Sequence, residues 1–371
     1  MGGESNSETL NPEIRKIRLS ELENFVQSNE YKRFPTVPIT PARAKSYLNN
    51  PHGKKEDVVL ILAFFYGELV AFRSLFAGVI QAEKVKIRFG WCSGNWVHPD
   101  FRRKGISKKL LEEAFSAWNG KLMFTNYAPE SEKLYLKTGW FTPIHQFDGA
   151  RAYLFPKTVK LLAGAQRNRF SKWFFSRVDS CIACYSNMNI LFFSYFKNPD
   201  IRFETIPVPD EETYRFLEVQ GENSLFGRNA EELKWIFQYP WISEINRESA
   251  GKYPFSSCST SFTYTTVKVW HKNKLTGVFI FSVREGHLKT LFFSYPPEMN
   301  NEIMRFIKQH CVKQKIEMIT IYNSAIANHL FARKFPFLHV KKYGQKIYST
   351  FGLDEVEKLH FQDGDGDVFF T

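Results

Sequence analysis

The residues best suited to chemistry form a short basic turn, Trp96 to Ser107. An apolar run rich in strand formers precedes it, and an amphipathic helical pattern follows over 101–118. The first N–H groups of a helix lack partners within the helix, and the helix dipole adds partial positive charge there. Such a turn binds phosphate. Gly105 allows close backbone approach, and three cations surround it: Arg102, Arg103 and Lys104. Taken alone, the turn also fits an ordinary strand–helix connection with solvated cations.

The same stretch resembles the acyl-CoA signature of the GCN5-related N-acetyltransferase superfamily. In that family a strand ending in Val-x-Pro leads into Arg/Gln-x-x-Gly-x-Gly/Ala. This chain has Val97-x-Pro99 and then Arg102-x-x-Gly105-x-Ser107, with serine in place of the last Gly/Ala. The resemblance implies that the amides of residues 103–107 hold the CoA diphosphate and that 96–98 pairs with the pantetheine arm. The cofactor-binding residues so implied are Trp96, Val97, His98, Arg102, Arg103, Lys104, Gly105, Ile106 and Ser107.

A second segment extends the resemblance to about residues 12–155. The family pattern of a strand ending in Asn and a later Leu-Tyr-x-Lys-x-Gly-Phe matches Asn126 and the run from Leu134 to Phe141. The resemblance implies that Tyr135 is the general acid that protonates the leaving thiolate. A phenol, with a reference pKa of about 10, suits that role. Tyr135 could instead be a core aromatic, and Asn126 could either bind the cofactor or cap the following helix.

The expected reaction is N-acetylation, in which a primary amine of an acceptor, most simply a small molecule, attacks the carbonyl of acetyl-CoA. The amine must lose a proton, yet the strand 89–97 contains no carboxylate. Backbone N–H groups near Val97 would polarise the thioester carbonyl. Cys92 is expected to be a buried thiol. Four groups remain candidates for the base: His98, Asp148, Glu68 and the terminal carboxylate of Thr371.

The hydrophobic pattern predicts a mixed α/β sheet with one parallel crossover. Helices are expected over 19–34 and from the Thr40-Pro41 start signal, and a hairpin over 58–66 and 69–79. Strand 87–97, helix 101–118, strand 121–127, helix 131–138 and one or two strands in 141–155 follow.

A second α/β unit is predicted from Ile201 onward. Its helices are expected at 210–219, 229–237, 300–314 and 327–333, and its strands at 263–270, 277–283, 288–293, 316–322 and 346–351. The segments after Asn126 and Asn323 match weakly, which indicates a tandem duplication. The second unit lacks the Arg-x-x-Gly signature and has Phe331 near the position of Tyr135. We therefore expect a catalytic domain at 1–155, a basic helical connector at 156–200, a degenerate acyltransferase-like domain at 201–352 and an acidic tail at 353–371.

The 371-residue chain has a formal net charge of +12, which fits an anionic cofactor but also nucleic acid or a membrane surface. No helix-turn-helix or finger pattern supports nucleic-acid binding, so this class and a non-catalytic acyl-CoA-binding protein are the alternatives. The polar start, the absence of a long apolar run and five scattered cysteines predict a cytoplasmic protein without membrane segments. We expect no metal site: the Asp363-Gly-Asp365-Gly-Asp367 run is an incomplete calcium loop and is interpreted as polar tail, and the Cys181/Cys184 pair as ordinary thiols.

Overall fold

The computed structural model describes residues 11–82, 85–126, 129–154, 198–220, 229–244, 252–255, 257–353 and 361–370. The predicted connector, with Cys181 and Cys184, falls almost entirely on 155–197 and lies outside the described residues.

The first half is built around a hairpin whose turn, Tyr66-Gly67, has positive φ at both residues. Its strands are β1 (Glu13–Arg18), β2 (Val58–Phe65), β3 (Glu68–Ala82), β4 (Val85–Val97), β5 (Leu122–Thr125) and β6 (Thr142–Tyr153). Its helices are α1 (Leu19–Gln27), α2 (Asn29–Arg33), α3 (Pro41–Leu48), α4 (Ile106–Ala117) and α5 (Pro129–Lys137), with a 3-10 turn at Pro99–Phe101.

The second half repeats this order with different lengths. Its strands in the main sheet are β7 (Ile201–Ile206), β10 (Phe262–His271), β11 (Lys274–Arg284), β12 (His287–Ser294), β13 (Met318–Ile321) and β14 (His339–Ser349). Its helices are α8 (Glu211–Gln220), α9 (Ala230–Gln238), α10 (Asn300–Lys313) and α11 (Ser324–Ala332). A separate pair, β8 (Ser243–Glu244) and β9 (Cys258–Ser259), completes the described strands.

Both halves belong to a single 12-stranded sheet, in the order β1-β2-β3-β4-β5-β14-β6-β13-β12-β11-β10-β7. Each half contributes four antiparallel strands followed by a parallel step, β4 to β5 and β12 to β13. The last strand of each half then pairs with the other half, because β14 lies between β5 and β6, and β6 lies between β14 and β13. The mixed α/β fold is thereby confirmed, whereas the residues at which the predicted domains begin and end stay predictions.

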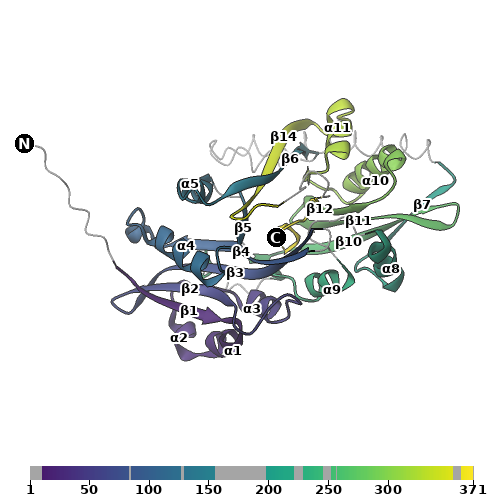
Figure 1. Cartoon of the computed structure of the whole chain (residues 1–371). Coiled ribbons are helices and arrows are strands. Elements are labelled where there is room, and N and C mark those ends of the chain that lie inside the picture. Colours follow the sequence, from purple (N-terminus) through teal and green to yellow (C-terminus); the bar gives the residue numbers. More distant parts are fainter. Residues whose placement is uncertain are drawn as a thin grey trace, which may run out of the picture.

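Helices cover both faces of the sheet (Figure 1). On one face α4 packs against the first half and α10 and α11 against the second, each over its own apolar core. On the other face α1 to α3, α8 and α9 share one core that includes the aromatic end of the chain, Phe369 and Phe370.

Several sequence predictions need correction. The helix expected over 19–34 is two helices, because Ser28 is extended and its hydroxyl accepts the N–H of Tyr31 as the cap of α2. The helix expected from 101 begins at Ile106. The edge strands β1 and β7 were not predicted.

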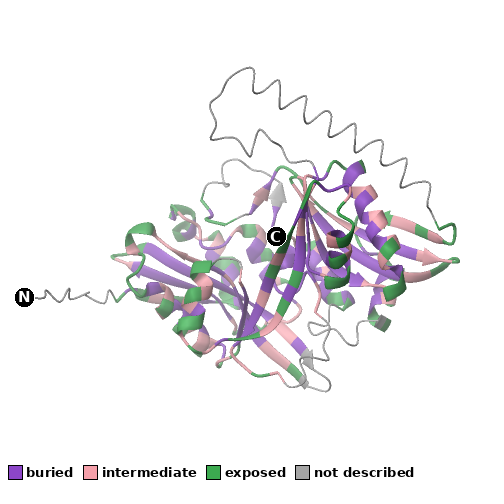
Figure 2. Cartoon of the chain, turned by 90° about the horizontal axis from the view of Figure 1, so that it is seen from above, coloured by how far each residue is buried: buried purple, intermediate pink, exposed green. Residues whose placement is uncertain are grey.

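The largest correction concerns the predicted polar tail. Its last residues lie in the centre of the molecule between the two halves (Figures 1 and 2). Asp363, Asp365 and Asp367 are only 3%, 1% and 5% exposed. Their charges suggested solvent contact, but each carboxylate is hydrogen-bonded within the protein, which allows burial.

Candidate active site

The first half of the sheet splits where β4 and β5 diverge. The two parallel strands pair only at Gly90–Leu122 and Trp91–Met123, so β4 runs on alone on that side from Cys92 to Val97. A bulge against β3 lies in the same stretch, because Ser74 pairs with Gly94 and Leu75 with Cys92, leaving Ser93 as the extra residue. The split leaves a strand edge along which an extended ligand arm can pair.

The basic turn follows this edge directly. Gly105 is the N-cap of α4 with φ of +79°, a conformation that costs a residue with a β carbon about 1–2 kcal/mol. Among the described residues, no protein group accepts the N–H groups of Gly105, Ile106 and Ser107, and a turn at Arg102–Arg103 precedes them. The side chains of Arg102, Arg103 and Lys104 are exposed beside them.

Two side-chain contacts fix the turn against β4. Ser107 Oγ and the Asn95 side chain exchange hydrogen bonds of 2.8 and 3.1 Å, which tie the first turn of α4 to the free part of β4. Arg102 Nε donates to Val97 O at 3.2 Å. Ile106 is buried under the helix, whereas Trp96, Val97 and His98 are half-buried at the strand end. The structure therefore brings the sequence-predicted residues of 96–107 together around one strand edge and one helix start.

Tyr135 reaches the beginning of the split from α5. Its phenol accepts a 2.6 Å hydrogen bond from Nη1 of Arg73, a fully buried residue of β3. Burial raises the pKa of Tyr135 to about 12, and the positive charge of Arg73 opposes that rise. Cys92, at the first position beyond the paired part of β4, is close enough to both side chains to interact with them. Burial also raises the pKa of the Cys92 thiol, so this group stays a neutral thiol, as expected.

Asn126 is hydrogen-bonded to the strand and helix next to it, and its role towards a cofactor stays a prediction. Its Oδ1 accepts the N–H of Lys346 at 2.6 Å, and its own N–H donates to the carbonyl of that residue at 3.1 Å. Its amide group also donates to Glu132 at 3.3 Å. Asn126 therefore joins the end of β5 to β14, the strand supplied by the other half.

The buried C-terminal segment bridges the two splits in the sheet. At its start Asp363 Oδ2 accepts the N–H of Tyr322, just after β13, and Gly364 donates to Leu291 O of β12 at 2.6 Å. Two residues later the backbone passes against β4, where a β carbon on Gly366 would overlap the indole ring of Trp91. The glycines of this run are therefore required by close approach rather than by calcium-loop geometry.

Asp367 ends this bridge beside the bulge of β4. Its Oδ2 accepts a 2.8 Å hydrogen bond from Ser93 Oγ, and Arg43 of α3 donates to the same serine oxygen. Arg43 also donates to Tyr47 Oη at 3.0 Å and to Tyr253 Oη at 2.9 Å. Asp367 thus supplies a carboxylate next to β4 that the strand itself lacks.

The four groups that the sequence offered as general bases are placed less favourably than Asp367 for a reaction beside β4. Glu68 and Asp148 are exposed, with Asp148 accepting a hydrogen bond from Gln146 at 3.0 Å. His98 lies 3.7 Å from the Asp100 carboxylate at the outer end of β4. Thr371 lies outside the described residues. Sequence reasoning missed Asp367 because its charge suggested a tail, and missed Arg73 although a single arginine in an apolar strand was a usable signal.

No group of three metal-ligating side chains occurs in the described part of the chain. None of the helices described there is both long and apolar enough to span a bilayer.

No protein-family model and no curated protein matches this sequence. Among solved structures, N-myristoyltransferase of Saccharomyces cerevisiae with bound myristoyl-CoA is similar with a TM-score of 0.52 and 13% identity, over 96% of this chain and 82% of that chain. A GCN5-related N-acetyltransferase from Anabaena variabilis ATCC 29413 has a TM-score of 0.48 and 9% identity, over 91% of this chain and 72% of that one. The first similarity shows that this chain shares the fold of that solved structure, and it agrees with the fold that the resemblance in the sequence predicted.

Proposed function

We propose that the chain is an acyl-CoA-dependent N-acyltransferase that acylates a primary amine. One observation carries the proposal: the N–H groups of Gly105, Ile106 and Ser107, at the start of α4, have no acceptor among the described residues and lie directly beside the unpaired edge of β4. Backbone amides at a helix start bind diphosphate, and an open strand edge can pair with the amide groups of a pantetheine arm. CoA carries a diphosphate followed directly by a pantetheine arm, so one CoA molecule could use the helix start and the strand edge together.

In this proposal Tyr135 donates the proton that the leaving thiolate receives. With its pKa raised to about 12 by burial, the phenol is fully protonated at neutral pH. The guanidinium of Arg73, 2.6 Å from the phenol oxygen, stabilises the negative charge that develops as the proton leaves. Arg73 is therefore a positioning and charge-stabilising residue rather than a proton donor, because guanidinium does not lose its proton in proteins.

Asp367 is the group that we propose to receive the proton of the amine. The nitrogen attacks the thioester carbonyl, the C–N bond forms, and the C–S bond breaks with the electron pair passing to sulfur. The ammonium proton goes to Asp367 and the Tyr135 proton goes to the thiolate, and the phenolate is then reprotonated by way of Asp367 or water. Before the reaction the guanidinium of Arg43 lies next to this carboxylate, with the hydroxyl of Ser93 between them.

Acetyl-CoA is the first donor to test, and the amine acceptor is open. The yeast enzyme of the same fold was solved with myristoyl-CoA, so longer acyl-CoAs are the second set. The full chain would be incubated with acetyl-CoA, octanoyl-CoA or myristoyl-CoA and a panel of amines, with free thiol measured over time. Amine-dependent thiol release supports the proposal. CoA binding without thiol release for any donor and amine would support a non-catalytic acyl-CoA-binding protein instead.

A further inference from the structure

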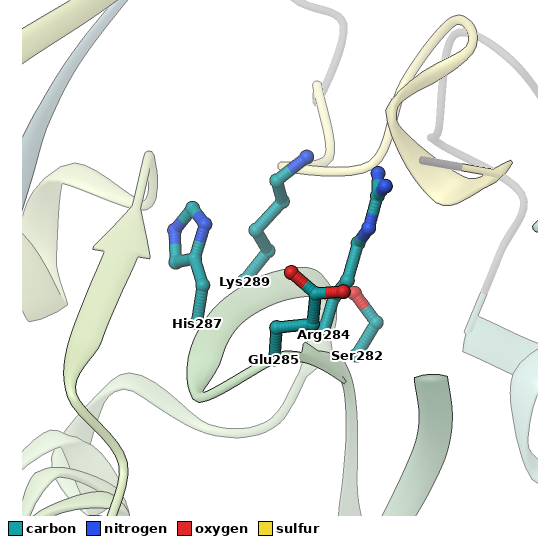
Figure 3. Close-up of a pocket in the computed structure, with 5 residues that line it drawn as sticks. All are labelled: Ser282, Arg284, Glu285, His287 and Lys289. Atoms are coloured by element: carbon teal, nitrogen blue, oxygen red, sulfur yellow. The ribbon is translucent and has the colours of Figure 1, made fainter. Parts of the chain in front are cut away.

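A polar pocket lies on the hairpin formed by β11 and β12, in the second half of the chain and apart from the basic turn. Its volume is about 280 Å³, and its lining is polar: Ser282, Arg284, Glu285, His287 and Lys289. Four of these residues form two cross-strand pairs, Ser282 with Lys289 and Arg284 with His287, so they share one face of the sheet. Figure 3 shows the side chains of Arg284 and Lys289 extending in the same direction, towards the C-terminal segment.

Among the described residues, three cations and two carboxylates act on this pocket. Arg284 and Lys289 line it, and Arg151 of β6 is near enough to act on the charges of His287 and Lys289. Glu285 is the one carboxylate in the lining. The Glu285 carboxylate accepts hydrogen bonds from Ser259 Oγ and from the N–H of Thr260. These bonds hold the neighbouring turn at residues 259–261. Asp367 acts on Lys289 from the C-terminal segment.

Burial and neighbouring cations lower the pKa of two side chains in the pocket. Burial, and then repulsion by Arg284 and Arg151, lower the pKa of Lys289 to about 8, although Asp367 acts in the opposite direction. Burial and the charge of Lys289 lower the pKa of His287 to about 3, so this imidazole is neutral near pH 7. Its Nε2 lies 2.9 Å from Thr320 Oγ1, which also accepts from Arg151 Nε. An anion that entered the pocket would relieve this repulsion.

The pocket is joined to the proposed reaction centre by a short piece of chain. Thr290, the residue after Lys289, donates to Asp363, and Asp367 accepts from Ser93 on β4. Four Cα–Cα steps of 3.8 Å separate those two aspartates, so their α carbons are at most about 15 Å apart. Asp367 itself acts on the charge of Lys289, so an acceptor anchored in the pocket lies on the side from which Asp367 is approached.

We propose that this pocket binds a carboxylate or phosphate group of the amine acceptor, which makes the acceptor an anionic amine. This inference rests on the proposed function and deepens it. Arg284, whose Nη2 also donates to Cys258 O at 3.0 Å, keeps further guanidinium donors for either oxyanion, and Lys289 supplies a second charge from the adjacent strand.

Kinetics with matched acceptors test the inference. A ladder of ω-amino carboxylates, from glycine to 6-aminohexanoate, and a ladder of ω-amino alkyl phosphates would be compared with uncharged alkylamines of equal length. Lys289→Met and Arg284→Gln should raise KM for the charged acceptors at least tenfold and leave KM for the alkylamines within twofold. Arg202→Gln, at the far edge strand β7, removes a cation without touching the pocket and should change neither. Equal KM effects on charged and uncharged amines would overturn the inference.

Direct binding separates this inference from the proposed activity. Acetate and inorganic phosphate would be titrated calorimetrically into the full chain at pH 8.5, in two buffers of different ionisation enthalpy. Because the bound anion favours charged Lys289, binding should take up protons, and Lys289→Met should abolish both the uptake and the affinity. Stronger binding of phosphate than acetate identifies a phosphate-bearing acceptor, and the reverse a carboxylate. No saturable binding of either anion overturns the inference, whereas anion binding without any thiol release overturns only the acyltransferase proposal.

Discussion

Asp367 Oδ2 and Ser93 Oγ are joined by a hydrogen bond of 2.8 Å, although the two residues are separated by 274 positions in the chain. Ser93 is the bulge residue of β4, at the start of its unpaired edge. This bond means that the proposed reaction centre of the first half is completed only when the end of the chain docks between the halves. The C-terminal segment is therefore part of the site rather than an appendage to it.

Asp367→Asn should lower kcat by roughly 100-fold or more, because it keeps the shape of the side chain and removes the proton acceptor. The matched control is Asp365→Asn, in the same buried segment, whose carboxylate accepts the N–H of Gln362. The measurement is kcat as a function of pH for wild type and both variants. A wild-type kcat and an unchanged pH profile in Asp367→Asn would eliminate this carboxylate as the base.

Tyr135→Phe should lower kcat by 10-fold to 1,000-fold while leaving the Kd for CoA within about twofold, because only the proton donor is lost. Tyr348→Phe is the control, since Tyr348 lies in the same apolar core and its hydroxyl donates to Glu132 at 2.6 Å. Steady-state rates and CoA titrations would be run in parallel. Undiminished turnover by Tyr135→Phe would assign the phenol to the core alone.

The carboxyl of Asp363 should make folding stability depend on pH. Burial raises its pKa to about 6 from an unfolded value of 3.8, so the folded state holds this proton more tightly. The contribution is fully present below about pH 4 and is lost as the pH rises through 6, which amounts to roughly 3 kcal/mol.

In the Asp363→Asn variant the side chain does not titrate, so this variant lacks the pH-dependent contribution and serves as the reference for wild type. Between pH 4 and pH 7 the free energy of unfolding of the variant, measured with urea, should rise relative to wild type by about this amount. A constant difference between the two proteins across that range would show that Asp363 titrates normally.

Close approach of the C-terminal segment to β4 is tested at Gly366. Gly366→Ala would force a β carbon into the ring of Trp91 at a φ of +77°, and should cost about 2–4 kcal/mol of stability. Gly352→Ala, where a β carbon meets no atom within 4 Å, should leave the thermal unfolding midpoint nearly unchanged. Equal midpoints for the two variants would mean that the segment does not pack on Trp91 in solution.

Local patterns in the sequence were sufficient to predict most of the strands and helices around the proposed site. The hairpin, the strand into Val97 and the basic turn are each specified by contiguous residues, and they are found where they were expected. The expected helix over 131–138 also corresponds to α5, which carries Tyr135 towards the split.

Contacts between distant segments could not be predicted in the same way. Strands β6 and β14 each pair with the other half of the sheet. The hydrogen bond that Asn126 accepts from the N–H of Lys346 secures this arrangement and joins residues 220 positions apart. Nothing near Asp367 in the sequence marks Ser93 as its hydrogen-bond partner. Without a known partner, the charge of Asp367 led to the prediction of a solvent-exposed tail. The polar pocket of β11 and β12 likewise arises only when Ser282 and Lys289 face each other across the hairpin.

Calorimetric titration of unacylated CoA into the full chain tests the central claim most directly. Wild type should bind one CoA per chain, with an affinity that falls as salt rises. Gly105→Ala should weaken binding at least tenfold, because α4 would no longer begin with its amides free at φ of +79°. Gly67→Ala imposes the same backbone strain at φ of +80° in the β2–β3 hairpin turn, also in open space but outside the helix start, and should bind CoA like wild type. Absence of CoA binding to wild type, or equal binding by all three proteins, would contradict the assignment of this turn as the diphosphate site.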